Sequence, residues 1–454
     1  MGGRVLIRGG TVISMDRDMG DLPKGDVLIE GDRIAAVASE VQAEAEVIDA
    51  SGFIVTPGFV DTHRHTWEAA IRGCAPDATL DDYFVEVLDT FAPLYRPQDV
   101  YASNLAGALE CLNAGITTLV DWSHINNTPE HPDAAIQGLK EAGIRAQYAY
   151  GSANTSLADY WFESKIAVPG DDVRRVRDTY FSSDQGLLTM ALATRGPGFC
   201  VDDVVRTEWN LARELDLPIT IHVAMGRLAG RFNMVRRLKD LGVLGVVPTT
   251  YIHCCYLTDE EWQLVADTGG TVSIAAQVEV QMGHGWPPVM KAYQYGLRPS
   301  LSVDVVTTVP GDLFTEMRCA FGCERARVHE VFWEQNKPSE GLLTSRQLLE
   351  MATVNGAHVV GLEDRIGSLT PGKKADLVLI DARAINVAPL IDPVAAVTLC
   401  ADVSNVDTVI VGGKVVKRDG RLLADVERAR RLVEESRDYL LEQRELRRRE
   451  RQQA

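Results

Sequence analysis

Several features that would assign this protein to a membrane or export class are missing from its sequence. No stretch of about eighteen consecutive apolar residues occurs, so no transmembrane helix is expected. The first residues lack the basic, apolar and small-residue order of an export signal, because Arg4 and Arg8 interrupt the only early apolar stretch. We therefore expect a cytoplasmic protein that has no membrane partner.

Positive charge is also scarce. The 454 residues include 46 lysines and arginines against 64 aspartates and glutamates, which gives a formal net charge of −18. Such a surface repels phosphates, so we expect no nucleic-acid partner. A neutral or cationic small-molecule substrate remains compatible with this charge.

The eight cysteines lack the paired spacing of a zinc ribbon. Because they are scattered and no export signal precedes them, we expect reduced thiols rather than disulfides. Cys319 and Cys323, four residues apart on an expected helix, form the one suggestive pair. Core packing is favoured for this pair over metal binding.

Apolar, β-like runs alternate with helix-like stretches through the middle of the chain. Eight runs occur, at 59–65, 116–123, 144–151, 187–195, 218–223, 250–255, 271–276 and 298–305. Eight β/α units predict a closed parallel (β/α)8 TIM barrel of about 250 residues. A doubly wound open sheet is the alternative, and it is disfavoured because no glycine-rich phosphate fingerprint follows the first run.

Short β-rich segments occur at both ends of the chain. Those at 4–13, 26–29 and 33–37 have the same texture as those at 374–381 and 406–417. We predict a small β-sandwich domain built from residues 1–57 and 365–424, interrupted by the barrel at residues 58–364. Residues 425–454, rich in Glu, Arg and Leu at helical spacing, predict a C-terminal helix that is solvated or packs on a partner.

Histidines and an aspartate stand at the ends of these apolar runs. His63 and His65 lie one residue apart, so on a β-strand both imidazoles face the same side and can converge on one metal ion. His222, His253 and Asp304 end three later runs, and the carboxyl ends of barrel strands form the active face. Imidazoles and one carboxylate suit zinc, with iron or manganese as alternatives, and leave a position open for water.

Such an ion lowers the pKa of bound water to about 7 and polarises an electrophile. Asp304 is expected to act both as a ligand and as the base that takes the proton of the attacking water. A single strand-end histidine is more often structural, but three histidine-bearing strand ends together with Asp304 favour a catalytic site.

Four segments resemble landmarks of the amidohydrolase superfamily. They are PGFVDTHRH at 57–65, GITT at 115–118, IHC at 252–254 and GSLTPGKKADL at 367–377. The most similar branch is that of the aromatic deaminases and triazine chlorohydrolases, which includes cytosine and guanine deaminase. The resemblance covers nearly the whole chain except the final helix. It implies a metal-dependent hydrolase that attacks a C–N bond (cyclic amide, amide or amino-substituted ring carbon) of a small planar molecule.

The resemblance also assigns residues. It implies one metal ion held by His63, His65, His222 and Asp304, and it matches His253 to the sixth-strand histidine that contacts the attacking water or the substrate. No lysine stands at the end of the fourth run, which disfavours a dinuclear centre on a carbamylated lysine. Many members are oligomeric, so a homo-oligomer is expected by analogy.

One position departs from the pattern of this branch. Its deaminases have a glutamate three residues after the fifth-strand histidine, where it shuttles protons, and this chain has Met225. Losing a general acid or base typically costs about 10²–10⁴ in rate. Glu279, His124 and His284 are therefore candidates for proton transfer or substrate contact, although a surface charge and loop hydrogen bonds would also explain them. Glu68 is a weaker candidate, because a helix is expected there.

Apolar and aromatic residues on the expected active face favour a planar substrate. Trp67, Trp122 and Trp286 fall in its loops and can sandwich a flat ring, although plain loop packing explains each of them equally well. Met225 would give the pocket an apolar, adaptable wall.

Two other functions stay open on the sequence. With Met225 in place of the shuttle glutamate, the same scaffold would suit a metal-assisted lyase, cyclase or isomerase. A non-enzymatic binding protein is the third possibility, and retention of all four ligand positions argues against it.

Overall fold

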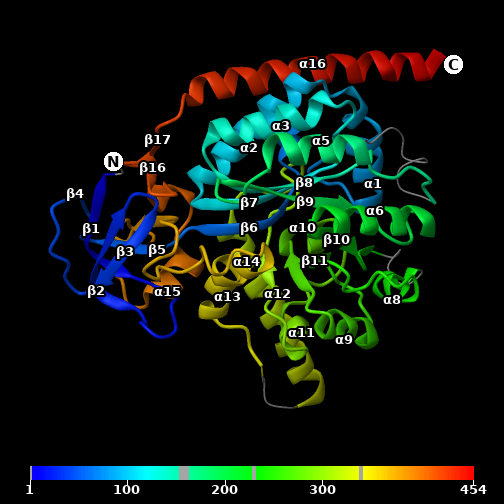
Figure 1. Cartoon of the computed structure of the whole chain (residues 1–454). Helices are drawn as coiled ribbons and strands as arrows, with labels where there is room; N and C mark the ends of the chain where they lie inside the picture. The colour runs from blue at the N-terminus through cyan, green and yellow to red at the C-terminus, as the bar shows by residue number, and fades with distance from the viewer. Residues whose placement is uncertain (1–2, 153–162, 227–231, 337–340, 454) are drawn as a thin grey trace.

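Eight parallel strands form the central sheet of the computed structural model, which describes residues 3–152, 163–226, 232–336 and 341–453 (Figure 1). They follow one another in sequence order: β6 (Phe59–Arg64), β7 (Ile116–Ser123), β8 (Arg145–Tyr150), β9 (Leu188–Thr194), β10 (Ile219–Val223), β11 (Thr249–His253), β12 (Thr271–Ile274) and β13 (Ser300–Leu301). Most of their residues are buried, as expected for parallel strands covered on both faces. Each strand coincides with one of the eight apolar runs, so the predicted barrel is confirmed.

The first and last strands complete the ring of strands. The amide of His65 donates to the carbonyl of Asp304 at 2.8 Å, and the amide of Asp304 donates to the carbonyl of His63 at 3.0 Å. Residues that are far apart in the sequence are thereby held together at the carboxyl edge of the barrel.

Helices surround the barrel, and short ones lie over its ends (Figure 1). They are η1 (Thr66–Ile71), α1 (Leu80–Tyr83), η2 (Phe84–Asp89), η3 (Ala92–Leu94), α2 (Pro97–Asn113), α3 (Glu130–Ala142), α5 (Gly170–Tyr180), α6 (Asp202–Leu215), α8 (Met234–Asp240), α9 (Asp259–Asp267), α10 (Ala276–Gln281), α11 (Val289–Gln294), α12 (Leu313–Gln335), α13 (Ser345–Ala352) and α14 (Val354–Val359). Among the helices that the structure describes, none has an apolar stretch long enough to cross a bilayer.

A second, nine-stranded sheet combines both ends of the chain. Its strands are β1 (Arg4–Val12), β2 (Leu22–Glu30), β3 (Arg33–Ala38), β4 (Glu46–Asp49), β5 (Phe53–Pro57), β14 (Leu377–Asp381), β15 (Val406–Val411), β16 (Lys414–Arg418) and β17 (Arg421–Leu422). The N-terminal and C-terminal parts meet where β5 pairs antiparallel with β14, with Ile54 opposite Ile380. The small β domain predicted from both chain ends is confirmed, whereas its exact bounds remain a prediction.

Gly58 carries the chain from the small sheet into the barrel. A Cβ at this position would lie 2.1 Å from Oγ1 of Thr117, so only glycine fits between β5 and β6. Nearby, the buried side chains of Arg145 in β8 and Asp376 form an ion pair, with 2.6 Å between Nε and Oδ2. These contacts fix the small sheet against the amino ends of the barrel strands.

The remaining C-terminal segments lie outside the barrel. The short turns α15 (Pro393–Ala395), η5 (Ala396–Cys400) and η6 (Val403–Asn405) connect β14 to β15. The long helix α16 (Val426–Gln453) runs across α2 and ends at the far side of the barrel (Figure 1). Arg428 anchors it by donating to the hydroxyl of Tyr101 at 2.8 Å.

Candidate metal centre and active site

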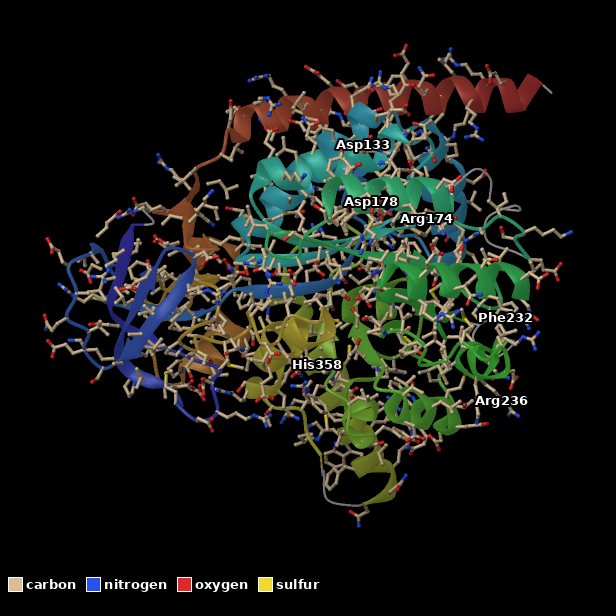
Figure 2. All side chains as sticks on the ribbon, in the orientation of Figure 1. Asp133, Arg174, Asp178, Phe232, Arg236 and His358 are labelled. Carbon is tan, nitrogen blue, oxygen red and sulfur yellow. The ribbon has the colours of Figure 1, made fainter. Side chains whose placement is uncertain are left out.

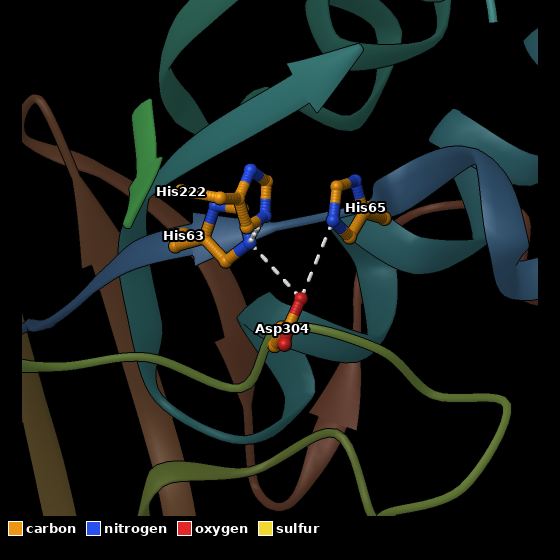
Figure 3. Close-up of side chains that lie close together, drawn as sticks. All are labelled: His63, His65, His222 and Asp304. Carbon is orange, nitrogen blue, oxygen red and sulfur yellow. Dashed lines mark hydrogen bonds and ion pairs between the residues drawn. The ribbon is translucent and has the colours of Figure 1, made fainter. Parts of the chain in front are cut away.

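Four side chains from three strand ends converge at the mouth of the barrel (Figure 3). His63 and His65 come from the end of β6, His222 comes from β10, and Asp304 follows β13. Nε2 of His63 lies 2.9 Å from Oδ1 of Asp304, and Nε2 of His65 lies 3.3 Å from the same oxygen. Nε2 of His222 lies 3.1 Å from Nε2 of His63. All four side chains are buried.

The backbone at these strand ends adopts an unusual conformation. Asp304, His253 and Ala224, which is two residues after His222, have φ values of +68°, +70° and +52°. Non-glycine residues rarely occupy this region, which costs about 1–3 kcal/mol each and is concentrated at functional sites. The strain turns the side chains of Asp304 and His253 toward the same space.

The donor set and its spacing fit one divalent metal ion. In a tetrahedral zinc site the ligand atoms lie about 2.0–2.1 Å from the ion and therefore roughly 3.3 Å from one another. The three distances of 2.9, 3.1 and 3.3 Å between donor atoms are close to that value. Two imidazole nitrogens that face each other are also readily explained by a cation between them.

Neighbouring groups orient two of the imidazoles. Nδ1 of His65 lies 3.0 Å from the carbonyl of Trp122, and Nδ1 of His253 lies 3.2 Å from Oε1 of Glu279. A proton on each Nδ1 leaves each Nε2 free to act as a ligand or an acceptor, as is usual around metal sites. Glu279, the partner of His253, is fully buried.

Burial keeps most of these imidazoles neutral, which is the form that binds a metal. It lowers the pKa of His63 and of His253 to about 4, in each case against the opposing attraction of Asp304. Burial and the neighbouring imidazoles hold the pKa of His222 well below its ordinary value. Burial alone would raise the pKa of Asp304, but the imidazoles outweigh it and hold this pKa well below the ordinary value.

A small cavity of about 30 Å³ opens beside the cluster. Its polar lining residues are His65, Tyr83, His124, His222, His253, His284 and Asp304. Its apolar lining residues are Leu80, Phe84, Leu88, Met225, Met282 and Val305. The apolar share of the wall suits a flat, weakly polar ring.

The structure brings most of the predicted site residues to this cavity. His124, Met225 and His284 line it. Trp122 is buried beside it, with its ring centroid 4.5 Å from that of His222. Trp67 is buried against the ring of His124 at 5.4 Å between centroids. The roles of these residues remain predictions.

Trp286 lies apart from the other predicted substrate-binding residues. It is 51% exposed and does not contribute to the described lining of the cavity. Its contact with substrate remains a prediction.

The sequence did not point to one wall of the cavity. Leu80, Tyr83, Phe84 and Leu88 come from α1 and the π-helical turn η2, which are too short to give a hydrophobic period. Glu68, weighed as a weaker candidate, is fully buried next to this wall. Its position three residues after His65 was the one available signal.

Comparison with known proteins identifies the family. The model of the amidohydrolase family matches residues 54–416. The chain belongs to the amidohydrolase family.

This amidohydrolase is 30% identical over 427 residues to the 5-methylthioadenosine/S-adenosylhomocysteine deaminase of Symbiobacterium thermophilum, covering 92% of this chain and 94% of the relative. It is 28% identical over 429 residues to the 5′-deoxyadenosine deaminase of Methanosarcina mazei, again covering 92% and 94%. The crystal structure of atrazine chlorohydrolase from Arthrobacter aurescens TC1, complexed with zinc, superposes with a TM-score of 0.83. The two sequences are 25% identical, and the superposition covers 95% of this chain and 100% of the chlorohydrolase. These relatives are hydrolases and deaminases, so the comparisons do not favour a lyase, cyclase or isomerase.

Proposed function

We propose that this protein is a metal-dependent hydrolase that replaces an amino group, or another nitrogen substituent, on a carbon of a small planar ring. The observation that supports this most is the convergence of His63, His65, His222 and Asp304 beside a largely apolar cavity. Zinc is the proposed ion, because the donor set is three imidazoles and one carboxylate. When bound, such an ion lowers the pKa of a water molecule to about 7 and polarises the carbon under attack.

Asp304 is the proposed acceptor of the first proton. Its Oδ1 faces His63 and His65, while its Oδ2 is turned toward Nε2 of His253 at 3.6 Å, beyond hydrogen-bond length. Oδ2 is therefore available to take a proton from the attacking water and to pass it to the departing nitrogen. His253, whose Nδ1 lies 3.2 Å from Oε1 of Glu279, presents Nε2 to the same space.

The cavity supports a planar substrate of modest polarity. Its walls combine the imidazoles of His124 and His284 with the side chains of Met225, Met282 and Phe84. A flat heteroaromatic ring can pack between such groups while its polar edge meets the imidazoles. The nucleosides and the triazine in the names of the relatives contain rings of this kind. These compounds are therefore the ones to test.

The test combines isotope labelling with metal analysis. The purified protein is incubated in oxygen-18 water with 5′-deoxyadenosine, 5′-methylthioadenosine, guanine or atrazine. The masses of the products are then measured by mass spectrometry. A hydrolase places one solvent oxygen in the product, requires the metal and regains activity with zinc after chelation. Product formation without solvent oxygen would contradict hydrolysis and favour an isomerase, a cyclase or a lyase.

A pair of histidine variants makes the metal assignment specific. His63→Ala removes a proposed ligand and is expected to lose both bound metal and turnover. His358→Ala is the matched control, because His358 lies on α14 outside the described cavity lining, where its ring contacts Glu363 at 3.0 Å (Figure 2). Unchanged metal content and activity in His63→Ala would overturn the proposed centre.

We further propose that the enzyme acts in the cytoplasm and as a homo-oligomer. The first proposal rests on eight free thiols in the sequence, which match a reducing compartment. The second rests on analogy with the family alone, and the mass of the purified protein in solution tests it.

A further inference from the structure

A buried carboxyl beside the cavity has no part in the chemistry assigned so far. Glu68, in η1, is fully buried. Its Oε1 accepts a 2.5 Å hydrogen bond from the hydroxyl of Tyr83, and its Oε2 accepts one from the hydroxyl of Thr307 at 3.3 Å. Removing an ionisable group from water is costly, and such groups are concentrated at functional sites.

Tyr83 connects this carboxyl to the reaction space. It ends α1, and it lines the same cavity as Met225, His222 and Asp304. Burial, followed by the charge of Glu68, holds the pKa of Tyr83 well above its ordinary value, so the phenol keeps its proton. The charge of Asp304 also acts on both Glu68 and Tyr83, which places the pair within electrostatic reach of the proposed metal centre.

The cavity wall that holds Met225 differs from the wall that holds Tyr83. Met225 lies three residues after His222, where the resemblance to the deaminase branch implies a shuttle glutamate, and its thioether cannot exchange a proton. Among the described residues that line the cavity, none on the β10 side carries a carboxyl, whereas the side formed by η1 and α1 has one that is reached through a phenol.

We propose that Tyr83 and Glu68 form the second proton carrier of this site and take the place of the glutamate missing at Met225. Tyr83 is the catalytic residue of the pair, and Glu68 is a positioning residue that acts through it. This inference rests on the proposed hydrolase function and names the residues that complete it.

The proton balance of the step is simple. Hydrolysis at an amino-substituted ring carbon moves two protons from the attacking water. One proton goes to the adjacent ring nitrogen as the C–O bond forms and the C=N bond opens. The other goes to the amine as the C–N bond breaks and its electron pair leaves with nitrogen. Asp304 takes the water proton that is delivered to the amine. For the proton that goes to the ring nitrogen, Tyr83 Oη accepts the water proton while its own proton passes to Oε1 of Glu68. Both transfers then reverse to protonate the ring nitrogen, so the pair ends as it began.

Two variants test the pair on the compound that the wild type hydrolyses. Tyr83→Phe and Glu68→Gln are each expected to lower kcat by about 10²–10⁴, the usual range for a lost general acid or base, with KM within a few-fold and metal content unchanged. Formate is expected to restore part of the turnover of Glu68→Ala by supplying a carboxylate in the space left behind. A residue with only a structural role would not give this separation of kcat from KM, nor this rescue.

Matched controls make the same chemical changes elsewhere. Tyr101→Phe removes an equally short hydroxyl contact, 2.5 Å from Oε2 of Glu141, on the outer helix α2. Glu208→Gln removes another fully buried carboxyl, on α6 and outside the described cavity lining. Both are expected to keep wild-type kcat.

The outcomes separate this inference from the proposed function. An active wild type with an equally active Glu68→Gln would overturn the relay and leave the hydrolase intact, whereas failure of the wild type on every compound contradicts the hydrolase itself. The hydrogen bond is also tested without substrate, because a hydroxyl proton that is buried and hydrogen-bonded to a carboxylate exchanges slowly with water and gives a downfield NMR signal. That signal must disappear in Tyr83→Phe and persist in Tyr101→Phe; its survival in Tyr83→Phe would overturn the relay.

Discussion

Asp304 and His63 are joined twice, once through the backbone and once through their side chains. The amide of Asp304 donates to the carbonyl of His63 at 3.0 Å, and its carboxylate lies 2.9 Å from Nε2 of the same histidine. The hydrogen bond that closes the barrel therefore also sets the distance between two proposed metal ligands that are 241 residues apart. Barrel closure and assembly of the metal centre are the same structural event.

The alignment of His63 with Asp304 depends on how β6 enters the barrel. Gly58 lies at this entry, so it should tolerate substitution poorly. Gly58→Ala places a methyl group against Thr117, with contacts as short as 2.1 Å. We expect a loss of about 1–3 kcal/mol in the free energy of unfolding, measured by chemical denaturation, as for other overpacked sites.

Gly322→Ala is the control for that substitution. Gly322 lies within α12, and a Cβ there meets nothing within 4 Å. It should stabilise the protein by about 0.5–1 kcal/mol, because alanine favours a helix interior. Equal effects of the two substitutions would contradict the steric account of Gly58.

Glu208 predicts a pH dependence of stability. Burial raises its pKa from 4.5 to about 7, although Arg195 lies 3.8 Å away. The folded state therefore holds this proton more tightly than the unfolded state, so the contribution of Glu208 to stability decreases as pH rises from 4.5 to about 7. Glu208→Gln removes this titration.

The comparison is made on the difference between variant and wild type. Relative to the wild type, Glu208→Gln should gain stability progressively across that pH window, by up to about 3 kcal/mol for a shift of this size. Denaturation series at several pH values measure it. A difference that does not change with pH would show that Glu208 ionises at an ordinary pKa.

Met225 allows a test that adds a proton carrier to the cavity instead of removing one. Met225→Glu puts a carboxyl three residues after His222, where the resemblance to the deaminase branch implies one, and in the Tyr83→Phe background it should recover on the order of tenfold of the lost turnover, since one proton carrier replaces another. Met282→Glu is the control, because Met282 also lines the cavity but does not follow His222. Recovery by both variants would indicate a nonspecific effect of added charge.

The barrel and its ligand candidates could be predicted because both leave local marks in the sequence. A buried parallel strand is a short apolar run, and a polar residue at its end, such as His222 or Asp304, interrupts that run at the active face. The final strand was predicted from the run at 298–305, although regular pairing is confined to β13 (Ser300–Leu301).

The wall that carries Tyr83 could not be predicted in this way. The segments α1 and η2 are four and six residues long, too short for a period to emerge. The bond from Tyr83 to Glu68 arises from tertiary packing between segments that have no shared sequence pattern. Likewise, three tryptophans looked equivalent in sequence, yet Trp67 and Trp122 are buried whereas Trp286 is half exposed.

The pairing of β5 with β14 has a consequence for how the protein is made. The two strands are separated by residues 58–376, so at a synthesis rate of about 5–20 residues per second β5 waits roughly 15–60 s for its partner. During that time the apolar strands β1 to β5 present an open edge that can pair with other chains. Yield in a cell is therefore expected to depend on chaperone supply and translation speed more than on the stability of the finished fold.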